Sequence, residues 1–409
     1  MEKIKMRQKS WQDGSVKTIT FIVTKDCQLA CKYCYLVGKN AKERMSWEVA
    51  KQAIDYILDQ EEDMIDESVV WDFIGGEPFI EIELIDKICD YLKIEMYRRA
   101  HHWFNSYRFS FSTNGLNYHT SKVQQFIEKN HKHLSIGITI DGTQQKHDLN
   151  RIYKMREGDT LERGSYYDVV RNIPLWLEQF PNAATKVTIS SEDIPYIKES
   201  VLHLYSLGIH QIHINCVFED VWKDGDDLLF EKQLIDLADA IIDNKYYSNY
   251  TCSFFVENLG KPKDPLRQNQ NWCGTGKMLA IDGLGNFYPC NRFAQFSLRS
   301  KTARIIGDVY NGIDKNKLRP FLSLDRCTQS TQKCIDCEVA EGCAWCQGEN
   351  YDTAETETIF QRSTAICKMH KARVRANNYY WNKLYRKLEL EGTREEFENN
   401  KREIKQEIC

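Results

Sequence analysis

The sequence predicts an α/β protein with a partial (β/α)6 TIM-like barrel in its first half and a cysteine-rich domain near its C-terminus. Between residues 17 and 217, six short segments rich in β-branched and aromatic residues alternate with segments of helical period. Eight of the 15 cysteines lie between residues 273 and 367. Three more, Cys27, Cys31 and Cys34, directly follow the first predicted strand. The first observation predicts the barrel, and the two cysteine groups predict metal or cluster sites.

Each strand of the barrel is predicted from a short β-type run, and each helix from apolar residues at helical spacing. The predicted strands are Thr18–Val23, Val69–Ile74, Tyr107–Ser112, Leu134–Asp141, Lys186–Ser190 and Gln211–Val217. The predicted helices are Trp47–Gln60, Ile82–Met96, Ser121–Asn130, Tyr166–Phe180 and Ile197–Leu207. Such alternation indicates a parallel sheet covered by helices, with the active site at the carboxyl ends of the strands.

The domain organisation follows from changes in composition along the chain. We expect a polar lead-in at 1–16, the barrel at 17–217, a bridging region at 218–272, a cysteine-rich domain at 273–370 and a charged helical tail at 371–409. The bridging region includes a predicted helix, Leu228–Asp243, and a polar, proline-containing linker, Asn258–Asn271. Cys409, at the end of the tail, is interpreted as a spare thiol.

Composition narrows the class of protein. The 409 residues carry a net charge of −4, which does not predict a basic surface for nucleic acid. The chain has neither an apolar signal stretch at its start nor an 18-residue apolar run, so neither secretion nor a membrane span is predicted. Fifteen cysteines in a protein expected in the reducing cytoplasm favour metal or cluster binding over disulfides.

The first cysteine loop has the spacing C-x3-C-x2-C. Three thiolates at this spacing can bind three irons of a four-iron cluster, which leaves the fourth iron open to a small molecule. The alternative is a zinc loop. Zinc requires a fourth ligand, and no second C-x2-C or histidine pair lies near this loop in the sequence.

With the aromatic Tyr33, these cysteines resemble the signature of the radical S-adenosylmethionine (SAM) superfamily. The resemblance implies that SAM chelates the open iron and is cleaved to methionine and a 5′-deoxyadenosyl radical. The sequence Gly75-Gly76-Glu77-Pro78, after the second predicted strand, is similar to the GGEP motif that holds the SAM amino group. Without this resemblance, it would be interpreted as an ordinary strand-to-helix turn.

Other SAM contacts are implied at the ends of later strands. Ser112 and Asn114 belong to an STNG sequence that resembles a motif near the SAM methionyl and ribose groups. Asp141 and Arg151 match an "IDG…HD..R" pattern and are expected at the ribose and the carboxylate of SAM. The remaining candidates, Ser190 and Val217, end the fifth and sixth strands. The alternative for each is a solvated surface residue, and His147 of the same pattern is as consistent with a structural role as with a catalytic one.

The second cysteine region resembles the SPASM extension of radical SAM enzymes that modify peptides. That extension has the pattern C, G-x4-C, C-x2-C-x5-C-x3-C, then C. The matching residues are Cys273, Gly285, Cys290, Cys334, Cys337, Cys343, Cys346 and Cys367. The chain departs from the pattern by having two residues, rather than three, between Cys343 and Cys346.

The resemblance implies two auxiliary clusters, which makes three [4Fe-4S] clusters in total. Cys334, Cys337, Cys343 and Cys367 are expected to hold the outer cluster, and Cys273, Cys290 and Cys346 the inner one. The inner cluster then keeps an open iron, unless Cys327 or Cys252 supplies a fourth ligand. The alternative for Cys334–Cys346 is a zinc knuckle, for which the five-residue gap is short.

The expected function is an oxidoreductase that makes thioether crosslinks, joining a cysteine sulfur to a carbon of another residue in a ribosomally made precursor peptide. The region around Cys273 and Cys290 resembles maturases of peptides with CXXX repeats (ranthipeptide type), in which the acceptor is acidic. The first alternative is a sulfatase-maturating enzyme that makes formylglycine. Members of that branch carry a basic aspartate where this chain has Asn291, which is a poor base. The second alternative is an iron–sulfur electron-transfer protein without SAM chemistry.

The expected partners are the precursor peptide and an electron donor such as a flavodoxin or ferredoxin. Many such maturases have an N-terminal winged-helix module that binds the leader peptide. Because the first cluster cysteine is already residue 27, we expect the leader to bind elsewhere.

Overall fold

The structure is a computed structural model that describes residues 15–39, 42–155, 157–263 and 273–408. Three sequence predictions therefore fall wholly or mostly outside the described residues: the lead-in at 1–16, the last part of the linker Asn258–Asn271, and the spare thiol of Cys409.

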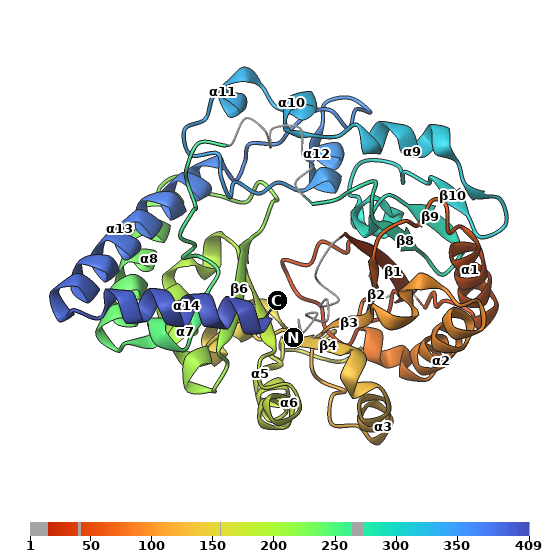
Figure 1. Cartoon of the computed structure of the whole chain (residues 1–409), viewed down its shortest axis with the longest axis horizontal. Helices are drawn as coiled ribbons and strands as arrows, with labels where there is room; N and C mark the ends of the chain where they lie inside the picture. Colours follow the sequence, from red (N-terminus) through yellow and green to blue (C-terminus); the bar gives the residue numbers. More distant parts are fainter. Residues whose placement is uncertain (1–14, 40–41, 156, 264–272, 409) are drawn as a thin grey trace, which may run out of the picture.

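The partial barrel is confirmed. Its strands are β1 (Val16–Thr24), β2 (Ser68–Gly75), β3 (Tyr107–Thr113), β4 (Leu134–Ile138), β5 (Ala184–Ile189), β6 (Gln211–Cys216) and β7 (Thr251–Cys252). Strands β1 to β4 are parallel neighbours in one sheet, and β5 to β7 are parallel neighbours in a second. Figure 1 shows the strands arranged around a central opening, with helices outside.

The two sheets meet at a break in the hydrogen-bond ladder after β4. Here Thr139 and Lys186 form one parallel bridge, and the Thr185 hydroxyl donates to the Ile138 carbonyl at 2.7 Å. The Ile140 N–H in turn donates to Thr185 Oγ1 at 3.2 Å. Because this side chain replaces a backbone partner, the fourth strand ends at Ile138, three residues earlier than predicted.

The helices of the barrel follow the predicted order. They are α1 (Trp47–Asp59), α2 (Ile82–Arg98), α3 (Ser121–Asn130), α4 (Gln144–Asn150), α5 (Tyr166–Val170), α6 (Ile173–Gln179), α7 (Ile197–Ser206) and α8 (Asp226–Asp243). The predicted single helix Tyr166–Phe180 is wrong in one respect, because it is divided into α5 and α6. Pro174 lies in the first turn of α6 and has no N–H with which to continue the helix from α5.

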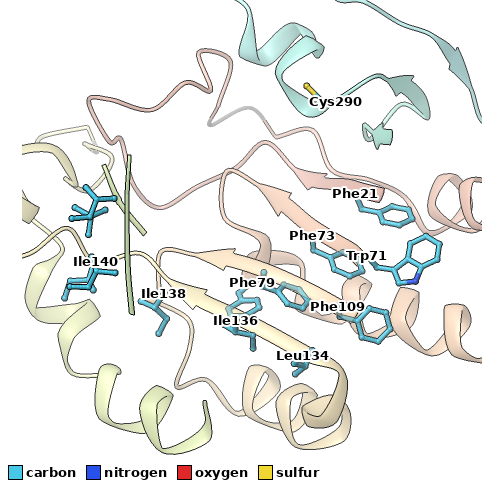
Figure 2. Packing of buried hydrophobic residues seen from close by; sticks show 14 of the residues in the cluster. Phe21, Trp71, Phe73, Phe79, Phe109, Leu134, Ile136, Ile138, Ile140 and Cys290 are labelled. Carbon is cyan, nitrogen blue, oxygen red and sulfur yellow. The ribbon is translucent and has the colours of Figure 1, made fainter. Parts of the chain in front are cut away.

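The core lies between the strands and the outer helices. Figure 2 shows Phe21, Trp71, Phe73 and Phe109 on this side of β1, β2 and β3, and all four are fully buried. Phe73 stacks on Phe21, with ring centroids 5.7 Å apart. Burial of each such ring stabilises the fold by about 1.5–3 kcal/mol. Since side chains of a strand alternate between its faces, the residues between these aromatics face the barrel interior.

The C-terminal region is continuous with the barrel. Its strands are β8 (Leu279–Ile281), β9 (Asn286–Tyr288), β10 (Gly307–Asp308) and β11 (Gly312–Ile313). Its helices are α9 (Lys315–Leu322), α10 (Arg326–Gln329), α11 (Gln332–Ile335), α12 (Gln347–Thr353), α13 (Cys367–Glu391) and α14 (Arg394–Ile408). Strand β8 pairs in parallel with β1, so the first sheet has the order β11-β10-β9-β8-β1-β2-β3-β4.

The predicted bridging region and tail also pack on the barrel. Strand β7 extends the second sheet beside β6, and α13 lies alongside α8. Figure 1 shows α10, α11 and α12 grouped together at the top of the view, apart from the helices of the barrel. The domain boundaries themselves stay a prediction. Within the described ranges, we find no helix with the length and apolar composition needed to cross a membrane.

Candidate active site

The first cysteine loop is held in place by the chain that follows α4. Leu29 forms an isolated antiparallel bridge with Tyr153. The Ala30 N–H donates to the Ile152 carbonyl at 2.8 Å, and the Lys32 N–H donates to the Asn150 carbonyl at 3.0 Å. The loop therefore has a defined backbone at the carboxyl end of β1, where the barrel is expected to build its site.

The three thiols of this loop lie close enough to interact. Cys27 is buried, whereas Cys31 and Cys34 are half-buried. Burial, together with the nearby Glu77 and Cys31, raises the pKa of Cys27 to about 12. The Cys31 thiol interacts in the same way with Cys34. A thiolate at Cys27 therefore requires a positive partner, and cluster iron is a partner that fits a donor set of three sulfurs.

The Gly75-Gly76 turn packs directly on the backbone that leads into this loop. The Gly76 N–H donates to the Thr24 carbonyl at 3.0 Å, and the Glu77 N–H donates to the Asp26 carbonyl at 2.9 Å. A Cβ atom on Gly76 would lie 2.2 Å from the Asp26 oxygen and 2.8 Å from the Cys27 Cβ. Only glycine therefore fits between the second strand and the cysteine loop.

The Glu77 carboxylate joins this turn to the turn after β3. One oxygen accepts from the Phe79 N–H at 3.1 Å and from the Thr113 hydroxyl at 2.6 Å. The other accepts from the Asn114 N–H at 2.7 Å. Burial raises the pKa of Glu77, and these hydrogen bonds offset part of the rise. The Asn114 amide reaches back to the Gln28 side chain at 3.1 Å, so the two predicted SAM motifs and the cysteine loop form one network.

A buried chain of charges anchors the loop on its other side. The Tyr33 hydroxyl donates to one oxygen of Asp141, and the Arg151 guanidinium donates to the Tyr33 hydroxyl at 3.0 Å. The other Asp141 oxygen accepts from the Thr188 N–H at 3.2 Å. Burial favours protonation of Asp141, but Lys146 and Arg151 overcome it, so the pKa of Asp141 is lowered. The Asp141 carboxylate thus connects the cysteine loop to β5; a ribose contact for it stays a prediction.

Arg151 also has an unused donor. Its side chain is buried and interacts with the Cys31 thiol, yet its Nε atom has no hydrogen-bond partner. A buried N–H beside the cluster loop is suited to an anionic ligand group, because leaving it unpaired is costly. This geometry fits the carboxylate of SAM.

The remaining predicted SAM residues lie at the carboxyl ends of three strands. Ser112 Oγ accepts from Lys186 Nζ at 2.8 Å. Ser190 Oγ donates to Asp193 Oδ2 at 2.7 Å, and the Val217 N–H donates to the Ile189 carbonyl at 2.9 Å. Pro78 begins the short 3-10 helix η1 (Pro78–Glu81) directly after Glu77. Their contacts with SAM stay predictions.

Lys186 is a residue of the barrel interior that the sequence analysis did not single out. The single bridge between Thr139 and Lys186 sets β5 beside β4, so the contact from the solvent-exposed Lys186 to Ser112 on β3 spans the strand between them, on the interior face of the barrel. Lys186 also interacts electrostatically with Asp72 on β2. The alternation of the strand could have revealed this position. Lys186 lies between the core residues Thr185 and Val187 and must therefore face the opposite side of the strand.

Three cysteines of the C-terminal region form an inner group. Burial, together with the nearby Cys273 and Cys346 thiols, raises the pKa of Cys290 to about 12. The hydroxyl of the buried Thr275 lies 3.1 Å from Cys273 Sγ and also bonds Cys290. Cys252, a possible fourth ligand, instead lies buried in β7, close to Tyr205 and Tyr380.

Four cysteines form an outer group. Burial raises the pKa of Cys343, Arg362 lowers it, and Cys367, Cys334 and Cys337 raise it. These four cysteines line a cavity of about 600 Å³. Cys327, the other candidate, is exposed in α10, and the adjacent Arg326 donates to the Cys334 and Ile335 carbonyls at 2.6 Å. The donor set of four thiols around a cavity fits a cluster. In the described ranges, no three His, Cys, Asp or Glu side chains lie close enough to bind one metal ion. A four-iron cluster instead takes one thiolate at each corner iron, so its ligands lie farther apart.

Tyr35 connects the first cysteine loop to the inner group. Its hydroxyl accepts from the Asn291 amide at 2.9 Å, and the Arg292 guanidinium carbon lies 4.5 Å from the centre of its ring. Burial raises the pKa of Tyr35, Arg292 opposes this rise, and the Cys34 and Cys290 thiols on either side contribute to it. Figure 2 shows Cys290 on the segment of the C-terminal region that lies beside β1. Tyr35 thus joins the first cysteine loop to the inner group.

Gly76→Ala is expected to displace the cysteine loop, because the new Cβ would overlap the Asp26 carbonyl and the Cys27 Cβ. The reconstituted variant should hold about four fewer irons per chain than the wild type, the content of one cluster. Gly225→Ala is the control for a glycine substitution away from the site, since no atom lies within 4 Å of a Cβ at Gly225 and the strain from its positive φ of 86° falls at the start of α8. Full iron content and unchanged SAM binding in Gly76→Ala would contradict this close contact.

Stability is expected to fall between pH 7 and pH 5 in part because of His147. This side chain is buried between the Asp141 N–H and the Ser165 hydroxyl, and burial lowers its pKa to about 3. Below pH 6.5 the unfolded chain therefore binds a proton that the native chain does not, and the native state loses about 2 kcal/mol by pH 5. Urea unfolding should show a shallower pH dependence for His147→Gln. An identical dependence in both proteins would rule out a neutral buried histidine.

Comparison with known proteins agrees with this architecture. Residues 13–159 match the family described as a 4Fe-4S single cluster domain. An uncharacterized protein of Methanocaldococcus jannaschii is 28% identical over 314 residues, which cover 75% of this chain and 92% of that protein. The radical SAM cyclopropyl synthase TigE of Paramaledivibacter caminithermalis is 21% identical over 349 residues, which cover 80% of this chain and 67% of that protein.

Solved structures share the fold over most of their length. Native anSMEcpe with bound AdoMet (SAM) has a TM-score of 0.65 at 18% identity, and the match covers 90% of this chain and 99% of that one. Streptococcus suis SuiB bound to its precursor peptide SuiA has a TM-score of 0.56 at 14% identity, over 86% of this chain and 76% of that one. Residues 13–159 thus match a 4Fe-4S single cluster domain, and the chain as a whole has the fold of anSMEcpe and SuiB.

Proposed function

We propose that this protein is a radical SAM enzyme that installs thioether crosslinks in a ribosomally made precursor peptide. The observation that carries this proposal is the grouping of the thiols. Interactions between cysteines join three in the first loop, three in the inner group and four in the outer group. These are the ligand numbers expected for two clusters with an open iron and one that is fully ligated.

The reaction must remove two hydrogens from the peptide. When bound, the first cluster and SAM would supply reductive cleavage of SAM and abstraction of one hydrogen atom from the acceptor carbon. The substrate cysteine would release its thiol proton, an auxiliary cluster would accept the one remaining electron, and a carbon–sulfur bond would form between the two residues. Cys273, Cys290 and Cys346 would hold the inner cluster, whose open iron suits the substrate thiolate. Arg151 and the Gly75–Glu77 turn would orient SAM.

Formylglycine synthesis is less well supported, because of the residue that follows Cys290. Asn291 directs its amide N–H₂ toward the Tyr35 hydroxyl at 2.9 Å. The amide is a donor in this contact and has no basic group that could take up a proton. The thioether route suits this arrangement, because the iron of the inner group would lower the pKa of the substrate thiol without a side-chain base.

A simple electron carrier would not require the contacts around the first loop. Arg151 has a buried Nε atom without a hydrogen-bond partner near Cys31, and the Gly75-Gly76 backbone packs closely against the first cysteine loop. These features suit a ligand that carries a carboxylate and an amine. SuiB, which shares the fold, was solved with its precursor peptide bound, and this supports a peptide as the substrate. A flavodoxin or ferredoxin would supply the initiating electron.

Lys186 favours an acidic acceptor residue in the peptide. Its ammonium lies in the barrel interior at the end of β3, where the acceptor would meet SAM. Among the described residues, no carboxylate oxygen lies within 4.0 Å of the Lys186 ammonium, the distance that defines an ion pair. The neighbouring His213 is neutral at pH 7, because burial lowers its pKa and Lys186 lowers it further. Lys186 does interact electrostatically with Asp72, whose pKa burial raises, but without an ion pair in place its ammonium can also pair with an incoming carboxylate.

The product distinguishes the proposed reactions. Anaerobic incubation with SAM, dithionite and the precursor peptide encoded beside the gene should yield 5′-deoxyadenosine and a peptide lighter by two hydrogens, with one thiol no longer alkylated. Cys27→Ala should abolish SAM cleavage, whereas Cys334→Ala should retain some SAM cleavage and lose the crosslink. Mass spectrometry that finds an aldehyde in place of the crosslink would instead establish formylglycine synthesis. SAM cleavage at the wild-type rate in Cys27→Ala would refute the cluster assignment.

Lys186→Met is expected to lower crosslinking of the natural peptide at least tenfold, because the acceptor carboxylate loses its partner. SAM cleavage without peptide should stay within about twofold of the wild type. Lys232→Met is the matched control, since Lys232 lies on the exposed face of α8 and pairs with Asp236. An equal rate for wild type and Lys186→Met on the natural peptide would contradict the role of this lysine.

A further inference from the structure

Arg362 makes a direct contact with the outer cysteine group. Its Nη2 atom donates to Cys343 Sγ at 3.0 Å, and its Nη1 atom donates to Ser330 Oγ at 3.2 Å. The guanidinium carbon lies 4.1 Å from the centre of the Trp345 ring. The guanidinium is thus fixed from three sides against one of the four thiols.

Hydrogen bonds also fix Trp345, the ring on which the Arg362 guanidinium stacks. Trp345 is buried, and its indole N–H donates to Gln329 Oε1 at 3.3 Å. Gln329 in turn donates to the Ile359 carbonyl at 2.8 Å and accepts from the Gln347 amide at 2.7 Å. In the sequence, Trp345 lies between Cys343 of the outer group and Cys346 of the inner group. Because the indole cannot move, the cation stacked on it cannot leave the thiol without losing two sets of contacts.

The charge of Arg362 is not neutralised by a neighbouring acid. Within the part of the chain that the structure describes, no carboxylate lies within the 4.0 Å ion-pair distance of its guanidinium. The cavity that the outer cysteines line also includes Lys333 and Lys371, and no Asp or Glu lines it. The electrostatic field of Arg362 therefore acts on the Cys343 sulfur with little local compensation.

We propose that Arg362 is a positioning residue that raises the reduction potential of a cluster held by the outer cysteines. This inference rests on the ligand assignment of the proposed function. Reduction adds one electron to a cluster, breaks no bond and makes its net charge more negative by one. A guanidinium that donates to a ligand sulfur stabilises that extra charge, so the reduced state is favoured. A purely structural arginine would leave the potential unchanged.

The test is a potentiometric EPR titration of the reconstituted full-length protein with dithionite. The outer cluster is identified as the signal that disappears in Cys334→Ala. Arg362→Gln removes the charge and keeps an N–H donor, whereas Arg362→Lys keeps the charge. The matched control is Arg304→Gln, because the Arg304 guanidinium stacks on the Tyr351 ring at 4.6 Å, and its hydrogen bond goes to the Glu357 carbonyl.

Arg362→Gln is expected to lower the equilibrium constant for reduction of the outer cluster at least tenfold, which is 59 mV for a one-electron couple. Arg362→Lys should recover most of this shift, and Arg304→Gln should leave the potential unchanged. Iron content should equal that of the wild type in all three variants. An unchanged reduction potential in Arg362→Gln with full iron content would overturn this inference and leave the proposed function standing. If Cys334→Ala retains every EPR signal of the wild-type protein, the ligand assignment and this inference both fail.

Discussion

The contact between the Gly75-Gly76 turn and the first cysteine loop is the constraint on which the rest of the site depends. Two backbone hydrogen bonds join the turn to residues 24 and 26, and the space between them excludes even a methyl group. This contact fixes Cys27 relative to β2. The Glu77 carboxylate then extends the same network to β3 through Thr113 and Asn114. Three neighbouring strands thus fix the position of one thiol, and the cofactor contacts we propose follow from that arrangement.

The inner thiol group is joined to the first cysteine loop through the first sheet and one side-chain contact. Strand β8 pairs with β1, and its hairpin with β9 leads to Cys290. Tyr35 and Asn291 join the two segments by one hydrogen bond. Cationic side chains lie beside buried sulfurs in all three groups, with Arg151 close to Cys31, Arg292 close to Cys346 and Arg362 on Cys343. Since burial disfavours thiolates, these arginines offset part of the cost of holding negatively charged clusters.

Much of this architecture was predictable from the sequence, because strand and helix periodicities are local. The six strands and the first cysteine loop follow from residues close together in the chain, whereas the inner and outer cysteine groups were expected only from the resemblance. The early end of β4 was not predictable, because the Thr185 hydroxyl that replaces a ladder partner comes from 45 residues away. Asp141 was predicted as a SAM ligand, yet both of its oxygens have protein partners that no spacing rule reveals. Lys186 was missed because its contact with Ser112 spans β4 on the interior face of a barrel that only the folded chain defines.

The most direct test of the account is EPR spectroscopy of the anaerobically reconstituted, dithionite-reduced protein before and after addition of SAM. We predict a [4Fe-4S] signal that requires Cys27, Cys31 and Cys34, and whose g-values shift when SAM is added, because SAM binds the iron that lacks a thiolate. SAM labelled with ¹⁵N at its amino group should show a hyperfine coupling to that signal. A signal that persists without these cysteines, or that SAM leaves unchanged, would contradict the claim that this loop holds a cluster with an open iron.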